Sequence, residues 1–198
     1  MNGTDSGKKL AYSKVWNLPN ILTYGRIIAV PLVAGLILWG GNNARWAALA
    51  IYLLAAVSDF FDGYLARRWK QQSSLGRMLD PIADKVLVAV VLLVLCADDI
   101  LRGGHIWAAI IILSREVLVS GLREYLGELQ VSVPVTKIAK WKTAVQMLAI
   151  GLLIAGPAGD TVIPHTTAAG LAMLWVAAAL TLYTGYDYFR AGIRHVVD

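Results

Sequence analysis

Cysteine, histidine and charged residues are scarce in this chain of 198 residues, which has one cysteine and three histidines. A single cysteine excludes an internal disulfide and cysteine-rich metal sites. Charged residues make up 16% of the chain, whereas soluble proteins contain about 25%. So little charge argues against a soluble domain and also against most nucleic-acid-binding proteins.

Apolar sequence is abundant instead: 58% of the residues are hydrophobic, and the mean hydropathy is +0.61. A transmembrane helix needs about 20 mostly apolar residues. We expect an all-α, polytopic membrane protein with a tail and juxtamembrane segment over residues 1–19 and one membrane domain over 20–198. Six stretches qualify as transmembrane helices, roughly 20–40, 45–68, 79–101, 105–127, 136–156 and 167–191. Arg26 interrupts the first, for which a cleaved signal peptide is the alternative, although no convincing cleavage site follows it.

The distribution of lysine and arginine predicts the orientation in the membrane. With six spans and a cytoplasmic N-terminus, sixteen of the eighteen basic residues fall on the cytoplasmic side, and only Arg45 and Arg102 fall outside. Cytoplasmic loops carry an excess of these residues. We therefore expect both termini in the cytoplasm and a multi-pass location in the cytoplasmic (inner) membrane. The net charge of +5 then reflects topology and contact with membrane lipids rather than nucleic acid.

Four aspartates stand in the stretch "SDFFDGYLARRWKQQSSLGRMLDPIADK", residues 58–85, between two apolar runs. Asp59 and Asp62 are three residues apart, and Asp80 and Asp84 are four apart, so each pair shares one helix face. Two carboxylates about 5 Å apart repel by roughly 3 kcal/mol at an effective dielectric constant of about 20. Divalent cations such as Mg²⁺ relieve this repulsion and prefer carboxylate oxygens. The stretch therefore predicts a site for two divalent cations, Mg²⁺ or Mn²⁺, of the kind that clamps phosphoryl groups.

Two alternatives for the aspartates stay open. Asp80 precedes Pro81, and this order is typical of a helix N-cap followed by proline at the first helical position. Carboxylates within a membrane also occur in cation transporters. A transporter should have polar groups near the middle of the membrane and a path outward, whereas the outer halves of the second and third stretches are apolar.

The aspartate stretch resembles the signature of CDP-alcohol phosphotransferases, D-x-x-D-G-x-x-A-R-x8-G-x-x-x-D-x-x-x-D, with every spacing intact. The resemblance implies a six-helix membrane domain, a homodimer, and transfer of a phosphatidyl or similar group from a CDP-linked donor to an alcohol with release of CMP. It also implies that the four aspartates hold two metals and that Asp84 is the base that deprotonates the alcohol. The matching positions are Asp59, Asp62, Gly63, Ala66, Arg67, Gly76, Asp80 and Asp84.

The same resemblance implies a binding site for the donor, CDP-diacylglycerol. Gly63, Ala66 and Gly76 would line the cytidine site, and Arg67 would face a phosphate. The segment "LPNILTYGR" resembles the start of the family's first helix. Its polar residues fall three apart, on one helical face, and would lie beside the diphosphate: Asn20, Thr23 and Arg26.

Basic residues near the cytoplasmic ends of the fourth and fifth spans predict the acceptor alcohol. They are Arg115, Arg123, Lys137, Lys140 and Lys142. Arginine within a membrane span is functional by default, and convergent cations suit a second phosphate. The strings around these residues resemble those of family members that use glycerol 3-phosphate. We therefore expect transfer of the phosphatidyl group to sn-glycerol 3-phosphate. Inositol phosphate is the alternative acceptor. The basic residues could instead serve only to set the orientation in the membrane.

Overall fold

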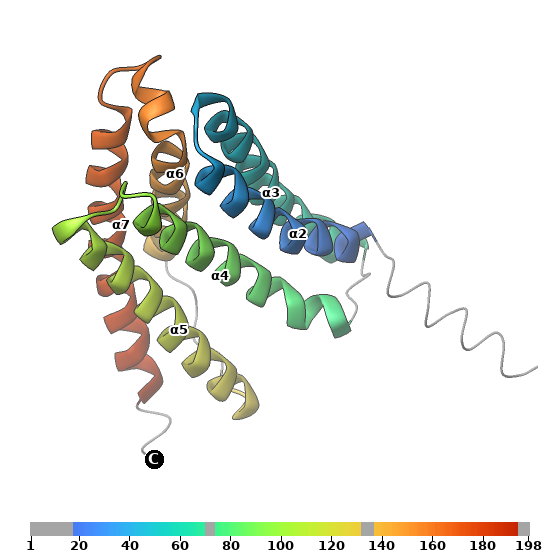
Figure 1. Ribbon diagram of the computed structural model, residues 1–198. Helices are drawn as coiled ribbons and strands as arrows, with labels where there is room; N and C mark the ends of the chain where they lie inside the picture. The colour runs from blue at the N-terminus through green and yellow to red at the C-terminus, as the bar shows by residue number, and fades with distance from the viewer. Residues whose placement is uncertain (1–17, 70–73, 132–136, 194–198) are drawn as a thin grey trace, which may run out of the picture.

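The computed structural model describes the backbone of residues 18–69, 74–131 and 137–193 (Figure 1), and their side chains except at 18, 19, 59–69, 74–77, 80, 137 and 140. The remaining residues, including the tail over 1–17, lie outside this description. Within it the chain forms six α-helices and one short 3-10 helix. These are α2 (Leu18–Trp39), α3 (Asn42–Trp69), α4 (Ser74–Ala97), η1 (Gly103–His105), α5 (Ile106–Glu128), α6 (Lys137–Asp160) and α7 (Thr166–Ile193).

Each of the six expected stretches is a helix, and the all-α class is confirmed. The largest difference is at α4, which begins at Ser74 rather than near residue 79. Pro81 therefore lies inside the helix and not at its first position, and the interpretation of Asp80 as an N-cap is wrong. As the eighth residue of the helix, Pro81 costs one backbone hydrogen bond, which a helix of 24 residues tolerates. Helix capping consequently does not explain why Asp80 is an aspartate.

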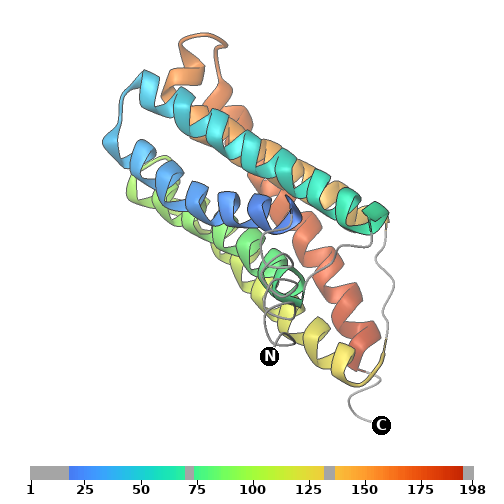
Figure 2. The same cartoon turned by 90° about the vertical axis from the view of Figure 1, so that its right-hand side faces the viewer.

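Successive helices run in opposite directions, so that helices two apart in the chain, such as α2 and α4, run in the same direction (Figures 1 and 2). Helix α2 packs against both α3 and α4, α6 packs against α3 and α7, and α5 packs against α7. Gly40 and Gly41 form the turn between α2 and α3 with φ values of +79° and +84°. Glycine suits these positions because other residues seldom adopt positive φ. Helix α2 therefore lies between the two helices that carry the aspartates.

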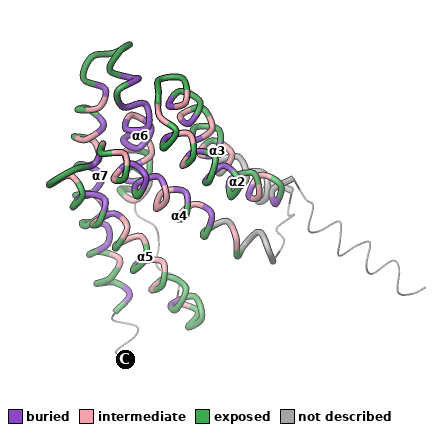
Figure 3. The backbone as a smooth tube through the Cα atoms, viewed as in Figure 1, coloured by how far each residue is buried: buried purple, intermediate pink, exposed green. Residues whose placement is uncertain are grey.

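The distribution of burial is that of a membrane protein, because many large apolar side chains are exposed and several cations are buried; Figure 3 shows where exposed and buried residues lie along the backbone. Trp39 is 88% exposed and Trp141 is 70% exposed, whereas Arg26 and Lys142 are 1% and 5% exposed. Lipid accommodates exposed apolar side chains, and ionisable residues in membrane proteins face the interior of the helix bundle. By length and composition, four segments among the described residues qualify as membrane spans: Asn20–Trp39, Gly103–Glu128, Trp141–Asp160 and Thr166–Ile193.

A buried arginine connects three helices at the end opposite the aspartates. Arg45, at the start of α3, forms an ion pair with Asp98 just beyond α4. Its Nη1 also donates a hydrogen bond to the carbonyl oxygen of Ile154 in α6, at 3.2 Å. Gly156 has a φ of +44°, and a Cβ atom there would lie 3.0 Å from Arg45 Nη1. A side chain at position 156 would therefore crowd the guanidinium.

One small-residue face of α6, formed by Gly151 and Ala155, has the spacing of helix-packing motifs in membranes. Both residues are buried within the chain. A Cβ atom on Gly151 would lie 3.6 Å from Leu49 and 3.9 Å from Tyr52, both in α3. This face therefore packs α6 against α3, and the expected homodimer stays a prediction that needs another interface.

Candidate active site

The polar face of α2 is buried. Asn20, Thr23 and Arg26 are 2%, 1% and 1% exposed. Burial of three polar side chains on one helix face needs polar partners, and α4 supplies one of them. Arg26 Nη1 donates a hydrogen bond to Asp84 Oδ1 at 3.2 Å. The structure thus joins one predicted donor-site residue to the predicted base.

The Arg26–Asp84 ion pair lies at the boundary between the interior and the surface. The Arg26 side chain is fully buried, whereas the Asp84 side chain is 49% exposed. The buried guanidinium restricts where the carboxylate can lie, because breaking a buried ion pair costs free energy. Asp84 is therefore held by Arg26 while about half of its side chain remains exposed. Such an oxygen ligand suits a hard divalent cation.

The other three aspartates lie on described helices, but their side chains are outside the description. Asp59 and Asp62 are in the last three turns of α3, and Asp80 is one turn before Asp84 in α4. Between Trp69 and Ser74 are four residues, which span at most about 18 Å when extended. The end of α3 and the start of α4 therefore lie within about 18 Å of each other. Four further signature residues have undescribed side chains too: Gly63, Ala66, Arg67 and Gly76.

Among the described side chains, no group of three or more histidine, cysteine, aspartate or glutamate residues is placed to hold a metal ion. This finding does not bear on the aspartates, because only Asp84 of the four is within that set. The chemistry of the donor set fits Mg²⁺ or Mn²⁺, since all four ligands are carboxylates. The dinuclear metal site accordingly stays a prediction from helical spacing.

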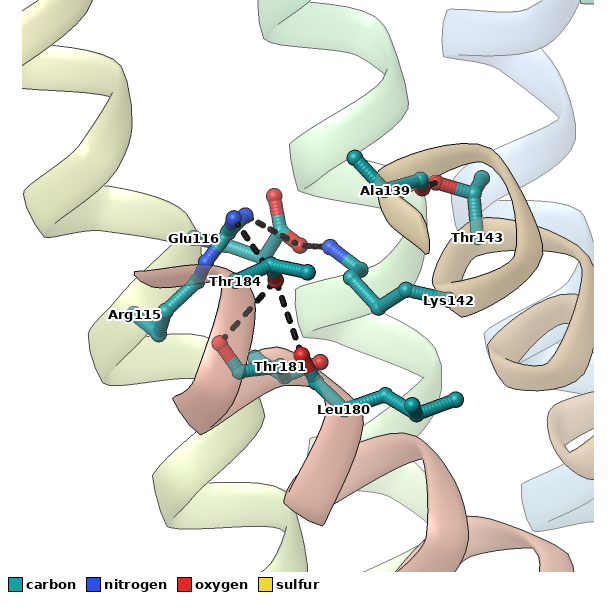
Figure 4. A network of polar contacts seen from close by, with 8 residues as sticks. All are labelled: Arg115, Glu116, Ala139, Lys142, Thr143, Leu180, Thr181 and Thr184. Atoms are coloured by element: carbon teal, nitrogen blue, oxygen red, sulfur yellow. Dashed lines mark hydrogen bonds and ion pairs between the residues drawn. The ribbon is translucent and has the colours of Figure 1, made fainter. Parts of the chain in front are cut away.

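A second group of polar side chains, which we call the Arg115–Lys142 cluster, consists of Arg115 and Glu116 from α5, Lys142 from α6 and Thr184 from α7 (Figure 4). Lys142 Nζ donates a short hydrogen bond to Glu116 Oε1. Arg115 Nη1 lies 3.6 Å from the same oxygen, and Arg115 Nη2 donates to Thr184 Oγ1 at 3.1 Å. Two of the five predicted acceptor-site cations therefore meet at one carboxylate oxygen.

Helix α7 shapes the position of Arg115 from two sides. Thr184 accepts the guanidinium hydrogen bond and donates its own hydroxyl hydrogen to Leu180 O at 2.8 Å. Next to it, Gly185 leaves room for the arginine stem, because a Cβ atom there would lie 2.8 Å from Arg115 Cγ. Such a contact is too close to persist, so any side chain at 185 would displace Arg115.

The remaining predicted cations are not part of this cluster. Arg123 is exposed, and its guanidinium lies 5.5 Å from the centre of the Tyr188 ring, a cation–π distance. It is nevertheless within electrostatic range of Arg115 and Lys142. The side chains of Lys137 and Lys140 are outside the description. The structure thus brings Arg115 and Lys142 together directly and places Arg123 at the periphery.

Sequence reasoning missed Glu116, Thr184 and Gly185. Glu116 follows Arg115 directly, and adjacent charges on a helix point in different directions, so nothing local indicates that they share a partner from α6. Thr184 and Gly185 stand in an apolar span with no charge nearby except Asp187 and Arg190. Their role depends on which helix packs against Arg115, which is a tertiary property.

Comparison with known proteins gives consistent similarities over most of the chain. A family profile described as CDP-alcohol phosphatidyltransferase matches residues 16–183. A protein of Cereibacter sphaeroides named CDP-diacylglycerol–glycerol-3-phosphate 3-phosphatidyltransferase is 42% identical, over 92% of this chain and 98% of that protein. Proteins with the same name are 45% identical in Rickettsia typhi, over 88% and 96% of the two chains, and 38% identical in Pseudomonas fluorescens, over 91% and 92%. The matched range contains all four aspartates, Arg115, Glu116 and Lys142.

Proposed function

This chain belongs to the CDP-alcohol phosphatidyltransferase family, and we propose on that basis that it transfers the phosphatidyl group of CDP-diacylglycerol to sn-glycerol 3-phosphate. The products are phosphatidylglycerophosphate and CMP. The observation that carries this conclusion is 42% to 45% identity, over about nine tenths of both chains, to proteins named for that reaction. The protein is therefore an enzyme of phospholipid synthesis, and the alternative interpretation as a cation transporter is wrong.

The donor would bind between α2, α3 and α4. Asn20, Thr23 and Arg26 form the buried polar face of α2 and would lie beside the diphosphate of CDP-diacylglycerol. Gly63, Ala66 and Gly76 would border the cytidine, and Arg67 would face a phosphate. When bound at Asp59, Asp62, Asp80 and Asp84, two Mg²⁺ or Mn²⁺ ions would neutralise charge on the diphosphate.

Asp84 would act as the general base of a direct displacement. The acceptor hydroxyl gives its proton to the Asp84 carboxylate, and its oxygen forms a bond to the phosphorus of the phosphatidyl group. The bond from that phosphorus to the CMP oxygen breaks, and CMP leaves with the electron pair. Arg26 supports this role because its hydrogen bond at 3.2 Å holds one carboxylate oxygen. A positioned base accelerates proton transfer by about 10²–10⁴-fold.

The Arg115–Lys142 cluster would bind the phosphate of glycerol 3-phosphate. A phosphate monoester carries a charge near −2 at neutral pH, as a phosphoserine does, and the donor diphosphate would repel it. Arginine provides a planar fork that suits phosphate, and lysine a mobile point charge. Anchoring the phosphate end would direct the far hydroxyl toward Asp84, so that part of the rate gain comes from positioning.

The reaction is tested directly with purified protein, labelled CDP-diacylglycerol and one acceptor at a time. Glycerol 3-phosphate should give labelled phosphatidylglycerophosphate and an equal amount of CMP. Inositol phosphate and serine, the acceptors of other reactions in this family, should give little product. Preferential transfer to either of these would overturn the assignment of the acceptor but leave the family assignment intact.

We expect Arg115→Ala to raise the KM for glycerol 3-phosphate roughly tenfold or more, equivalent to about 1.4 kcal/mol. The KM for CDP-diacylglycerol should change little, because the expected donor residues are on other helices. Arg123→Ala should have a smaller effect, since Arg123 lies on the Tyr188 ring. Steady-state kinetics with each substrate varied in turn would measure both constants.

A glycine pair provides the matched control. Gly185→Ala keeps Arg115 but displaces it, so the acceptor KM should rise here too. Gly121→Ala adds the same methyl group where no heavy atom lies within 4 Å and should leave both KM values unchanged. An unaltered acceptor KM in both Arg115→Ala and Gly185→Ala would show that the basic cluster reflects topology alone.

We further propose that α3 and α4 complete a set of six spans, with both termini and the aspartates on the cytoplasmic side of the inner membrane. The bias of lysine and arginine supports this orientation. In a Cys96→Ala background, a membrane-impermeant thiol reagent should label Glu128→Cys only from the cytoplasmic side and Val162→Cys only from outside. Both positions are exposed helix-end or loop sites. The opposite labelling pattern would reverse the orientation and separate the site from its cytosolic substrates.

A further inference from the structure

Glu116 occupies the position between the two cations of the Arg115–Lys142 cluster. Its Oε1 accepts a hydrogen bond from Lys142 Nζ and lies 3.6 Å from Arg115 Nη1 (Figure 4). The Lys142 and Arg115 side chains are only 6% and 13% exposed, and Glu116 is 20% exposed. One carboxylate oxygen thus serves two largely buried cations, at the place where an oxygen of a bound phosphate would contact both.

This arrangement follows from the cost of burying like charges together. Arg115 and Lys142 repel each other, and Arg123 is close enough to add to the repulsion. Without a counterion, a pair of buried cations is strongly unfavourable. Glu116 supplies that counterion when no substrate is bound. The same carboxylate then stands in the way of an incoming phosphate, because both anions need the same two donors.

We propose that Glu116 is an exchangeable counterion, which the phosphate of the acceptor displaces from Arg115 and Lys142 and which returns to them when the product leaves. This inference rests on the proposed function and extends it to specificity and product release. A phosphate dianion offers more charge and more acceptor oxygens than one carboxylate, so it can replace Glu116 at both cations. An alcohol without a phosphate cannot, and it would find the cations already neutralised.

Product release gives the exchange its second role. The transferred alcohol keeps its own phosphate, so phosphatidylglycerophosphate carries the group that the cluster binds. A cluster with no internal competitor would retain the product as firmly as it binds the substrate. Return of Glu116 to Lys142 and Arg115 lowers the affinity for both and lets the lipid product move into the membrane.

The test compares Glu116→Gln with the wild-type protein and with Glu128→Gln, which makes the same change at an exposed position of the same helix. Glutamine keeps the shape and a hydrogen-bond acceptor for Lys142 but removes the competing charge. Glu116→Gln should bind glycerol 3-phosphate and inorganic phosphate about tenfold more tightly in calorimetric titrations. Phosphatidylglycerophosphate should inhibit it at correspondingly lower concentration. The KM for CDP-diacylglycerol should stay within about twofold.

Tighter binding is a result that structural damage would not produce. Unchanged or weaker binding of both anions by folded Glu116→Gln would overturn the proposal and leave Glu116 as a fixed structural partner. If Glu116→Gln does not fold, Glu116→Asp replaces it. Aspartate keeps the charge but is one methylene shorter, so its hold on Lys142 weakens, and anion affinity should rise by a smaller factor. If the anion affinity of Glu116→Asp does not rise, that result also contradicts the exchange.

Inorganic phosphate separates this proposal from the proposed function, because its binding needs no acceptor alcohol. If the wild-type protein transferred the phosphatidyl group to another alcohol, the function proposed above would fail, and the phosphate titrations would still decide whether Glu116 competes for the cluster. If glycerol 3-phosphate is the acceptor and the titrations of Glu116→Gln show no gain, the function stands and the exchange fails.

Discussion

Replacing Asp84 by asparagine is expected to abolish phosphatidyl transfer, with turnover reduced by about 10³-fold or more, while binding of CDP-diacylglycerol survives at least in part. Asparagine has nearly the same shape as aspartate and keeps an oxygen that can accept the Arg26 hydrogen bond, which in the wild-type protein is 3.2 Å long. It cannot take a proton from the acceptor hydroxyl. Loss of a positioned base removes about 10²–10⁴-fold of rate, and loss of a charged metal ligand adds to that.

The measurement combines product formation with equilibrium binding of CDP-diacylglycerol to the purified variant. Asp99→Asn is the matched control, because Asp99 is exposed at the other end of α4 and has a φ of +57°, which asparagine adopts readily. That variant should retain full activity. Near wild-type turnover of Asp84→Asn would show that Asp84 is not the base. Complete loss of donor binding would instead assign Asp84 to metal binding alone.

Removal of divalent cations should have an effect of similar size. Excess EDTA is expected to eliminate activity, and Mg²⁺ or Mn²⁺ in excess of the chelator should restore it. Four carboxylates gathered at one site would repel one another when no cation is present. Asp59→Asn, Asp62→Asn and Asp80→Asn should each reduce turnover by a factor of about 10² or more, as loss of one strong electrostatic contact typically does.

Binding of Mn²⁺, followed by electron paramagnetic resonance, provides a readout independent of turnover. The wild-type protein should bind two Mn²⁺ ions per chain in the presence of donor, and each asparagine variant fewer or more weakly. The control is EDTA already saturated with Mg²⁺, which should leave the enzyme active. Full turnover in excess free EDTA, or undiminished Mn²⁺ binding by all three variants, would contradict a dinuclear site at these aspartates.

The helices could be predicted from sequence because their signal is local. Apolar runs of about 20 residues need only be long enough to cross lipid, and each of the six is a helix. That Asn20, Thr23 and Arg26 share one helix face was likewise predictable from a spacing of three. Bounds were less predictable: α4 begins before Pro81, since charged and small residues extend the helix beyond the apolar run.

Pairings between helices were not predictable, because they depend on packing. Arg26 and Asp84 are 58 residues apart in the chain, and Lys142 meets Glu116 across 26 residues. The sequence gives no reason to distinguish Arg115 from Arg123 as a ligand of the acceptor phosphate. Eight residues of helix, however, span about 12 Å, too far for both side chains to hold one small anion as Arg115 and Lys142 hold Glu116. The roles of the aspartates rest on the family signature, since three of the four side chains lie outside the described set.

Two arginine–aspartate pairs hold α4, Arg26 with Asp84 near its middle and Arg45 with Asp98 just beyond its C-terminal end. The two aspartates are 14 residues apart, a helical length of about 21 Å, with no proline between them. Helix α4 is therefore an uninterrupted helix between Asp84 and Asp98, and an ion pair anchors it at each of these two residues. If the ion pair of Asp98 is lost, α4 can tilt about the ion pair of Asp84 and change the direction of the Asp84 carboxylate, the proposed base. A kinetic defect caused by substitution of Arg45 or Asp98 would consequently report altered alignment over a distance rather than contact with substrate.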